Sequence, residues 1–169
     1  MSMISHEFLG SIAPALVHDK SCYSASKLSD AHRQELEFLL QLSDDYPGIE
    51  RWFIQKVIVG QLIGTRHVFR IEREDRLVAL GIAKDEAGEK KICTVRVHPL
   101  YMGRGLGVRI FDQLLHWLRT DKPVLTVSER NLPKFQRLFD HYGFVQTSKK
   151  FDFYREGVAE FGYNEVPPH

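Results

Sequence analysis

The stretch from Cys93 to Gly107, CTVRVHPLYMGRGLG, determines how this chain folds. The apolar residues up to His98 predict a strand, and the glycines that follow predict a tight turn. An apolar stripe at helical spacing then predicts a helix that ends by Pro123. The stripe consists of Leu106, Ile110, Leu114, Leu115 and Leu118.

The glycine turn has the chemistry of an anion site. Glycines let the backbone approach a ligand closely and adopt positive φ, and the first N–H groups of a helix have no intrahelical partner. A helix start also carries roughly half a positive charge, which favours a phosphate or pyrophosphate. Arg104 and Arg109 lie where they can add charge-assisted hydrogen bonds.

Two common nucleotide-binding loops do not match this turn. A Walker loop ends in Gly-Lys-Ser/Thr, which is missing here. A dinucleotide loop has the pattern G-x-G-x-x-G, and counting from Gly103 places Val108 at the third glycine. The elements before the turn also do not form a βαβ unit, so neither nucleoside triphosphate hydrolysis nor dinucleotide binding is favoured.

The flanking segments predict an α/β fold with a mixed sheet. Before the turn, Ser29-Asp30 predicts a helix start, and a second helix carries Ile49, Trp52, Phe53 and Val57 on one face. Residues 67–72, 76–83 and 90–98 read as an antiparallel meander. After the turn we expect a strand at 124–127, parallel to 90–98, a helix that stops at Gly143, and strands at 149–154 and 158–163 around an Arg155-Glu156-Gly157 turn.

Composition predicts a single soluble, cytoplasmic domain. The chain has 169 residues, 43% of them hydrophobic, which suits one buried core over residues 1–169. Its net charge of +1 gives no general attraction to nucleic acid, and no apolar run is long enough to cross a membrane. Cys22 and Cys93 are too far apart in sequence to suggest a paired cysteine metal site, so no metal is expected, and Cys93 reads as a small core residue.

The segment Gly103-Arg-Gly-Leu-Gly107, after a Val-x-Pro strand end, resembles the acetyl-CoA pyrophosphate loop of the GNAT superfamily, Q/R-x-x-G-x-G/A. Ser128-Glu-Arg-Asn131 and Tyr142-Gly-Phe144 resemble the family's fifth strand and the end of its fourth helix. The matching core runs over about residues 66–144. The resemblance implies a mixed, mostly antiparallel twisted sheet of about six to seven strands with about four helices. A splayed parallel strand pair then forms the acetyl-CoA cleft.

The resemblance implies an acetyl-CoA-dependent N-acetyltransferase. Acetyl would pass directly to an amine of a small molecule, protein or peptide in a ternary complex. The pantetheine arm would pair with free backbone groups of the strand that ends at His98, and a backbone N–H there would hold the thioester oxygen. The cofactor residues implied are Val95, Arg96, Val97, Met102, Gly103, Arg104, Gly105, Leu106, Gly107, Val108 and Asn131.

Two residues depart from the family pattern. Met102 stands where Gln or Arg is usual, so one side-chain donor is missing while the backbone donors are kept. Phe139 stands where many members have a tyrosine that protonates the leaving thiolate, and phenylalanine has no proton to give. The sequence leaves the acid and base open. The candidate catalytic residues are His98, Ser128, Glu129 and Tyr142, and the candidate acceptor-side residues are Trp52 and Phe53.

Two other functions stay open at this point. A CoA-binding sensor that has lost catalysis is consistent with Phe139, and a toxin of the same fold could acetylate aminoacyl-tRNA, although the near-neutral charge argues against nucleic acid. The acceptor amine is not identified by any motif. Homodimers are common in the family, but no segment marks an interface.

Overall fold

The computed structural model describes residues 2–4, 27–42, 46–153 and 155–166. Two sheets form its centre, with strand orders β1-β4-β3-β2 and β5-β7-β6, and all pairings within them are antiparallel. The strands are β1 (Ser2–Ile4), β2 (Arg66–Arg73), β3 (Arg76–Glu86), β4 (Glu89–Val97), β5 (Leu125–Ser128), β6 (Gln146–Phe151) and β7 (Ala159–Tyr163).

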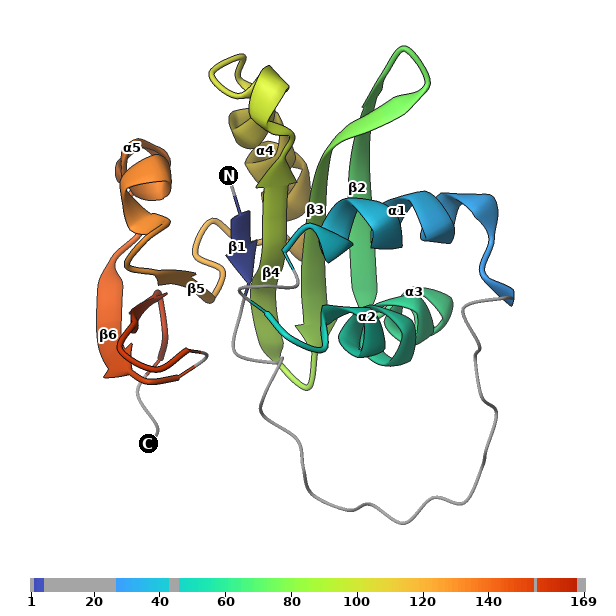
Figure 1. Cartoon of the computed structure of the whole chain (residues 1–169). Helices are drawn as coiled ribbons and strands as arrows, with labels where there is room; N and C mark the ends of the chain where they lie inside the picture. The colour runs from blue at the N-terminus through green and yellow to red at the C-terminus, as the bar shows by residue number, and fades with distance from the viewer. Residues whose placement is uncertain (1, 5–26, 43–45, 154, 167–169) are drawn as a thin grey trace.

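Among the described residues, the backbone bridge between the two sheets lies at the start of β4 and just before β5. Lys91 and Val124 form a parallel bridge, in which the Ile92 N–H donates to the Val124 carbonyl at 3.0 Å. From this bridge the two strands diverge, and β1 lies between them (Figure 1). The expected splayed parallel pair is therefore confirmed.

Helices cover both faces of the larger sheet (Figure 1). The helices α1, α2 and α3 lie on one face and α4 on the other, and α5 lies against the smaller sheet. Their bounds are α1 (Asp30–Leu40), α2 (Ile49–Trp52), α3 (Val59–Ile63), α4 (Leu106–Leu118) and α5 (Leu132–Tyr142), and a π-helical segment (Phe53–Ile58) joins α2 to α3.

Two residues explain how these helices are placed. The Ser29 hydroxyl accepts the His32 N–H at 3.2 Å and caps α1, as the sequence predicts. Gly81 on β3 lets α4 pack closely on the sheet, because a Cβ at this position would collide with Ile110 and Leu114. The position of α4 matters for the site, since the glycine turn leads directly into it.

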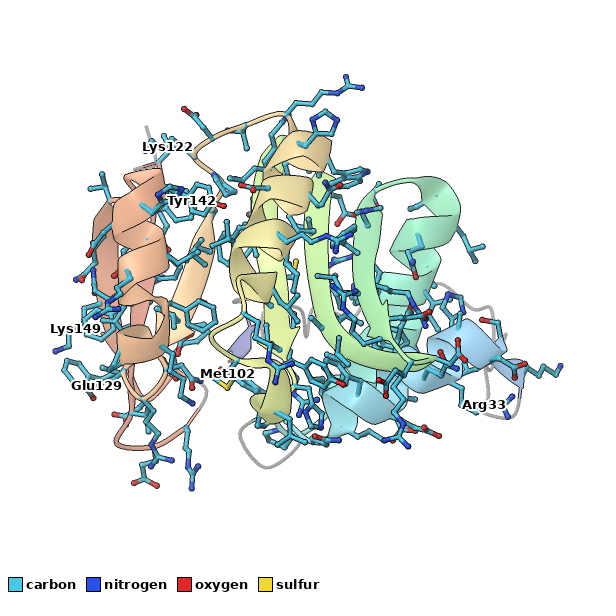
Figure 2. All side chains as sticks on the ribbon, turned by 90° about the horizontal axis from the view of Figure 1, so that it is seen from above. Arg33, Met102, Lys122, Glu129, Tyr142 and Lys149 are labelled. Carbon is cyan, nitrogen blue, oxygen red and sulfur yellow. The ribbon has the colours of Figure 1, made fainter. Side chains whose placement is uncertain are left out.

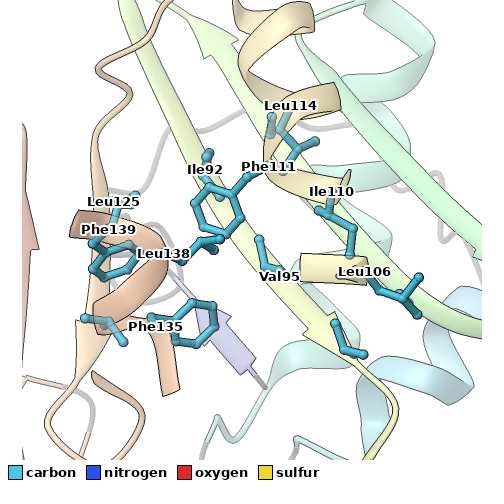
Figure 3. Close-up of a cluster of buried hydrophobic side chains, with 14 of the residues drawn as sticks. Ile92, Val95, Leu106, Ile110, Phe111, Leu114, Leu125, Phe135, Leu138 and Phe139 are labelled. Atoms are coloured by element: carbon cyan, nitrogen blue, oxygen red, sulfur yellow. The ribbon is translucent and has the colours of Figure 1, made fainter. Parts of the chain in front are cut away.

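The main hydrophobic core lies between the sheets, α4 and α5 (Figure 3). Ile110, Phe111, Phe135 and Phe139 are fully buried there. A second core lies under α1, α2 and the π-helical segment, on the other face of the larger sheet. Cys93 is fully buried in this second core, in agreement with the prediction, whereas Cys22 lies outside the described residues.

Most predicted elements are confirmed. The helix α4 ends at Leu118, before Pro123 as predicted, because Arg119 adopts a left-handed conformation at φ 52° that closes it. Strand β6 begins three residues earlier than expected, since its exposed sequence QTSKKF has no apolar alternation to mark it. Strand β1 is unexpected. Among the described residues, no helix is long and apolar enough to cross a membrane.

Candidate functional site

The glycine turn presents an uncapped helix start. Gly103 and Gly105 both have φ near 75°, a left-handed conformation in which glycine avoids steric strain. Gly105 is the N-cap of α4 and has no side chain to accept the helix N–H groups. A Cβ at either glycine would meet nothing within 4 Å, so the turn is open to the outside on this side. The local geometry therefore suits an anion, as the sequence predicts.

This turn forms one wall of a cavity of about 340 Å³, which we call the loop cavity. The opposite wall is α5, whose Lys134 and Arg137 line the cavity. Figure 2 shows Met102 between the turn and the start of α5. The remaining lining residues are Val97, Tyr101, Gly103, Gly105, Leu106, Gly107, Val108 and Leu138. Lys134 and Arg137 thus place two cationic side-chain donors across the cavity from the turn, whereas Met102 has no such donor.

A second cavity of about 200 Å³ adjoins the first, and we call it the Glu160 cavity. Lys134 lines both cavities, and its Nζ donates to Oδ1 of Asn131 at 3.2 Å. The Glu160 cavity is lined by Tyr46, Ser128, Arg130, Asn131, Lys134, Arg155, Val158 and Glu160. Of the predicted site residues, Ser128 and Asn131 are thus brought together here, within reach of the glycine turn through Lys134.

Glu160 is a buried carboxyl group in this second cavity. Its side chain is 5% exposed, and within the described chain its Oε1 has no hydrogen-bond partner. Burial raises the pKa of Glu160 to about 7, and a hydrogen bond with Thr126 opposes this shift only in part. A carboxyl group of this kind can exchange a proton near neutral pH.

The edge of β4 that faces the cleft is covered by β1. Ser2, Met3 and Ile4 pair antiparallel with Arg96, Val95 and Thr94, respectively. The expectation that these backbone groups are free is therefore wrong. The physical reason is that an open sheet edge accepts any extended segment that can satisfy its N–H and C=O groups.

The side chains of β4 point away from this edge. Those of Val95 and Val97 are buried in the main core, toward α4. The Arg96 guanidinium lies on the other face, 4.3 Å from the Phe38 ring, where it donates to Oε1 of Gln41 at 2.5 Å. None of these three side chains therefore faces the edge of β4 that pairs with β1.

Three candidate catalytic or anion-binding side chains lie outside both cavities. The Nδ1 of His98 accepts the Leu100 N–H at 3.2 Å and so caps the short turn before the glycines. Glu129 is exposed, and its backbone N–H donates to Ala159. Arg104 stacks over the Tyr101 ring at 5.2 Å.

Tyr142 and Phe139 of α5 also line neither cavity. Tyr142 lies at the far end of α5 from Met102 (Figure 2), and its hydroxyl donates to Oδ1 of Asp112 at 2.6 Å. Burial and Asp112 raise its pKa well above the usual range, so the phenol keeps its proton. Phe139 is fully buried, 4.7 Å from the Tyr163 ring and 5.6 Å from the Phe135 ring, and serves the packing of the main core.

Trp52 and Phe53 are both core residues. Their side chains are 5% and 0% exposed in the second core, and neither lines the two cavities described above. Tyr46, which is buried in the connection between α1 and α2, lines the Glu160 cavity. No three His, Cys, Asp or Glu side chains of the described residues gather as metal ligands.

Several lining residues of the two cavities were not predicted as site residues, among them Lys134, Arg137, Glu160 and Tyr46. Lys134 and Arg137 follow Asn131 at intervals of three residues, a helical spacing that could have identified a cationic face. Glu160 is the one acidic residue in an otherwise apolar strand, which is also a usable signal. Tyr46 carries no such signal, because only the fold brings it to this cavity.

Comparison with known proteins finds one family. Residues 41–164 match the family described as Acetyltransferase (GNAT) domain. A protein of Desulfovibrio desulfuricans assigned to the GNAT family has a similar structure, with a TM-score of 0.65 and 15% identity, over 80% of this chain and 92% of that chain. An aminoglycoside 6'-N-acetyltransferase complexed with coenzyme A gives 0.60 and 11%, over 82% and 93%.

A third structure is a Salmonella typhimurium protein assigned as an acetyltransferase and solved with acetyl-CoA. It has a TM-score of 0.53 and 18% identity, over 68% of this chain and 69% of that chain. At these identities the structural matches show the fold alone. A search of curated proteins finds no match.

Proposed function

Because this chain belongs to the GNAT family of acetyltransferases, we propose that it transfers the acetyl group of acetyl-CoA directly to an amine. The observation that carries the proposal is the uncapped start of α4 at Gly105, which opens into the loop cavity opposite Lys134 and Arg137. Two cations and a row of backbone N–H groups are suited to the diphosphate of coenzyme A.

The rest of the coenzyme would follow the chain of contacts from the loop cavity. Lys134 connects that cavity to Asn131 and Ser128, so the thioester end would lie toward the Glu160 cavity. The pantetheine arm would take the edge of β4 at Val95–Val97 in place of β1, and a backbone N–H there would hold the thioester oxygen. The amine would enter from the Glu160 cavity.

Thermal unfolding with acetyl-CoA tests the proposal. A ligand at 100 times its dissociation constant adds about 2.7 kcal/mol to stability, so we expect a clear rise in Tm at millimolar acetyl-CoA. Pantetheine, which lacks the diphosphate, is the control and should give a much smaller rise. If neither acetyl-CoA nor pantetheine raises Tm, the proposal is overturned. A rise in Tm without release of CoA thiol in the presence of amines would instead identify a CoA-binding module.

Removing β1 is expected to tighten acetyl-CoA binding. If β1 and the pantetheine arm use the same edge of β4, the affinity is reduced by the fraction of molecules in which β1 is docked. We expect roughly tenfold tighter binding when residues 2–4 are deleted, measured by isothermal titration calorimetry. Met3→Pro keeps the length and removes one backbone donor opposite Val95, so it should act in the same direction. Unchanged affinity in both variants would show that β1 does not compete.

A further inference from the structure

Among the described residues, Glu160 is the one acidic side chain that lines the Glu160 cavity, and Arg130, Lys134 and Arg155 are the cations there. It is 5% exposed and, within the described residues, its Oε1 lacks a hydrogen-bond partner. A buried carboxyl oxygen without a partner costs stability. Because this oxygen lies in a cavity wall, a bound ligand could supply the missing partner.

The strand pairing fixes which way Glu160 faces. Ala159 and Tyr163 of β7 belong to the main core beside α5. Side chains alternate along a strand, so Glu160 lies on the other face of the smaller sheet. Ser128 of β5 is its direct partner in the register and lines the same cavity. The carboxyl group is thus next to the strand end that leads to Asn131.

We propose, on the basis of the function given above, that Glu160 accepts the proton of the acceptor amine, and that the cations of this cavity select amines that also carry an acidic group. A dication such as a polyamine would place its second charge near Arg130 or Arg155, since Lys134 faces the proposed diphosphate site. An acidic group would instead pair with them.

The reaction balances as follows for a protonated amine. Its N–H proton passes to the Glu160 carboxylate, and the freed lone pair attacks the carbonyl carbon of the thioester. The C–N bond forms, the C–S bond breaks and CoA leaves as a thiolate. The second N–H proton, which becomes acidic once the C–N bond has formed, passes to this thiolate, directly or through water. Glu160 then releases its proton to solvent. The products are the N-acetyl amide and CoA.

Four cationic residues line the same cavity as Glu160 or lie beside it in the sheet. Arg130, Lys134 and Arg155 line the cavity, and Lys150 lies beside Glu160 in the register of β6. Burial nevertheless raises the pKa of Glu160 to about 7. The base is therefore protonated and inactive below this pH, so kcat/KM should fall as the pH drops below about 7.

The test uses the full chain and four amines: L-lysine, cadaverine, spermidine and glycylglycine. Glu160→Gln keeps the shape of the side chain and removes the base, so we expect kcat to fall about 100-fold or more, with no acidic limb near pH 7. The matched control is Glu156→Gln, at an exposed residue of the turn before β7, which should behave as wild type in both respects. The rise in Tm with acetyl-CoA should be the same in all three proteins.

L-lysine and cadaverine differ only in the carboxylate, so this pair tests the cations. We expect kcat/KM for lysine to exceed that for cadaverine by about tenfold or more in wild type. An equal or reversed ratio overturns the selection of acidic amines. Wild-type turnover by Glu160→Gln overturns the base, as does the absence of turnover with all four amines while acetyl-CoA still raises Tm. If acetyl-CoA fails to raise Tm, the proposed function itself is wrong.

Discussion

Replacing Gly105 by valine is expected to weaken acetyl-CoA binding about 100-fold while the protein stays folded. At φ 75° a β-branched residue is strained, so either the turn moves or the strain is stored there. In both cases the N–H groups at the start of α4 lose their alignment. The new side chain also points into space that no protein atom occupies within 4 Å, on the side where the ligand would approach.

Gly64→Val is a matched control for this variant. Gly64 has φ 79°, again with nothing within 4 Å of an added Cβ, but it caps the end of α3 and lies outside both cavities. The two variants should lose similar stability, about 1–3 kcal/mol from backbone strain, and only Gly105→Val should lose affinity. Isothermal titration calorimetry and urea unfolding measure the two quantities separately. Equal affinities in the two variants would place the diphosphate elsewhere.

The glycine turn and its flanking elements were predictable because their signals are local. Three glycines, an apolar stripe and a left-handed cap at Gly143 each depend on residues within a few positions. The predicted meander and the helix α5 follow for the same reason. Strand β6 was misplaced because it is an exposed strand, whose pattern is not imposed by a core.

The lining of the Glu160 cavity was not predictable as a set, because it depends on how the two sheets assemble. Glu160 lies beside Ser128 because β5 and β7 pair in this register. Tyr46, from the connection between α1 and α2, lines the same cavity. The aromatic pair Trp52 and Phe53 has the helical spacing typical of a core, and both side chains are buried in one. From the sequence alone, the side chains of Trp52 and Phe53 could not be assigned either to the wall of a pocket or to the core.

Phe139→Ala is expected to cost about 3–5 kcal/mol of stability, the largest loss of any single truncation considered for this chain. The Phe139 side chain is fully buried, and four aromatic rings surround it. Their centroids lie 4.7 Å (Tyr163), 5.6 Å (Phe135), 5.8 Å (Phe144) and 6.3 Å (Phe111) away. Removing the ring leaves a cavity where α5 contacts α4 and β7.

Phe151→Ala makes the same truncation at a side chain that is 64% exposed, and it should change stability by only about 0.5 kcal/mol. Urea unfolding compares the two variants, and similar midpoints would show that α5 is not held by this cluster. Because α5 carries Lys134 and Arg137, Phe139→Ala should also bind less acetyl-CoA. The cause is a smaller folded fraction of the protein. High acetyl-CoA should therefore restore its folded fraction by mass action, whereas in Gly105→Val the protein is folded and the site itself is impaired.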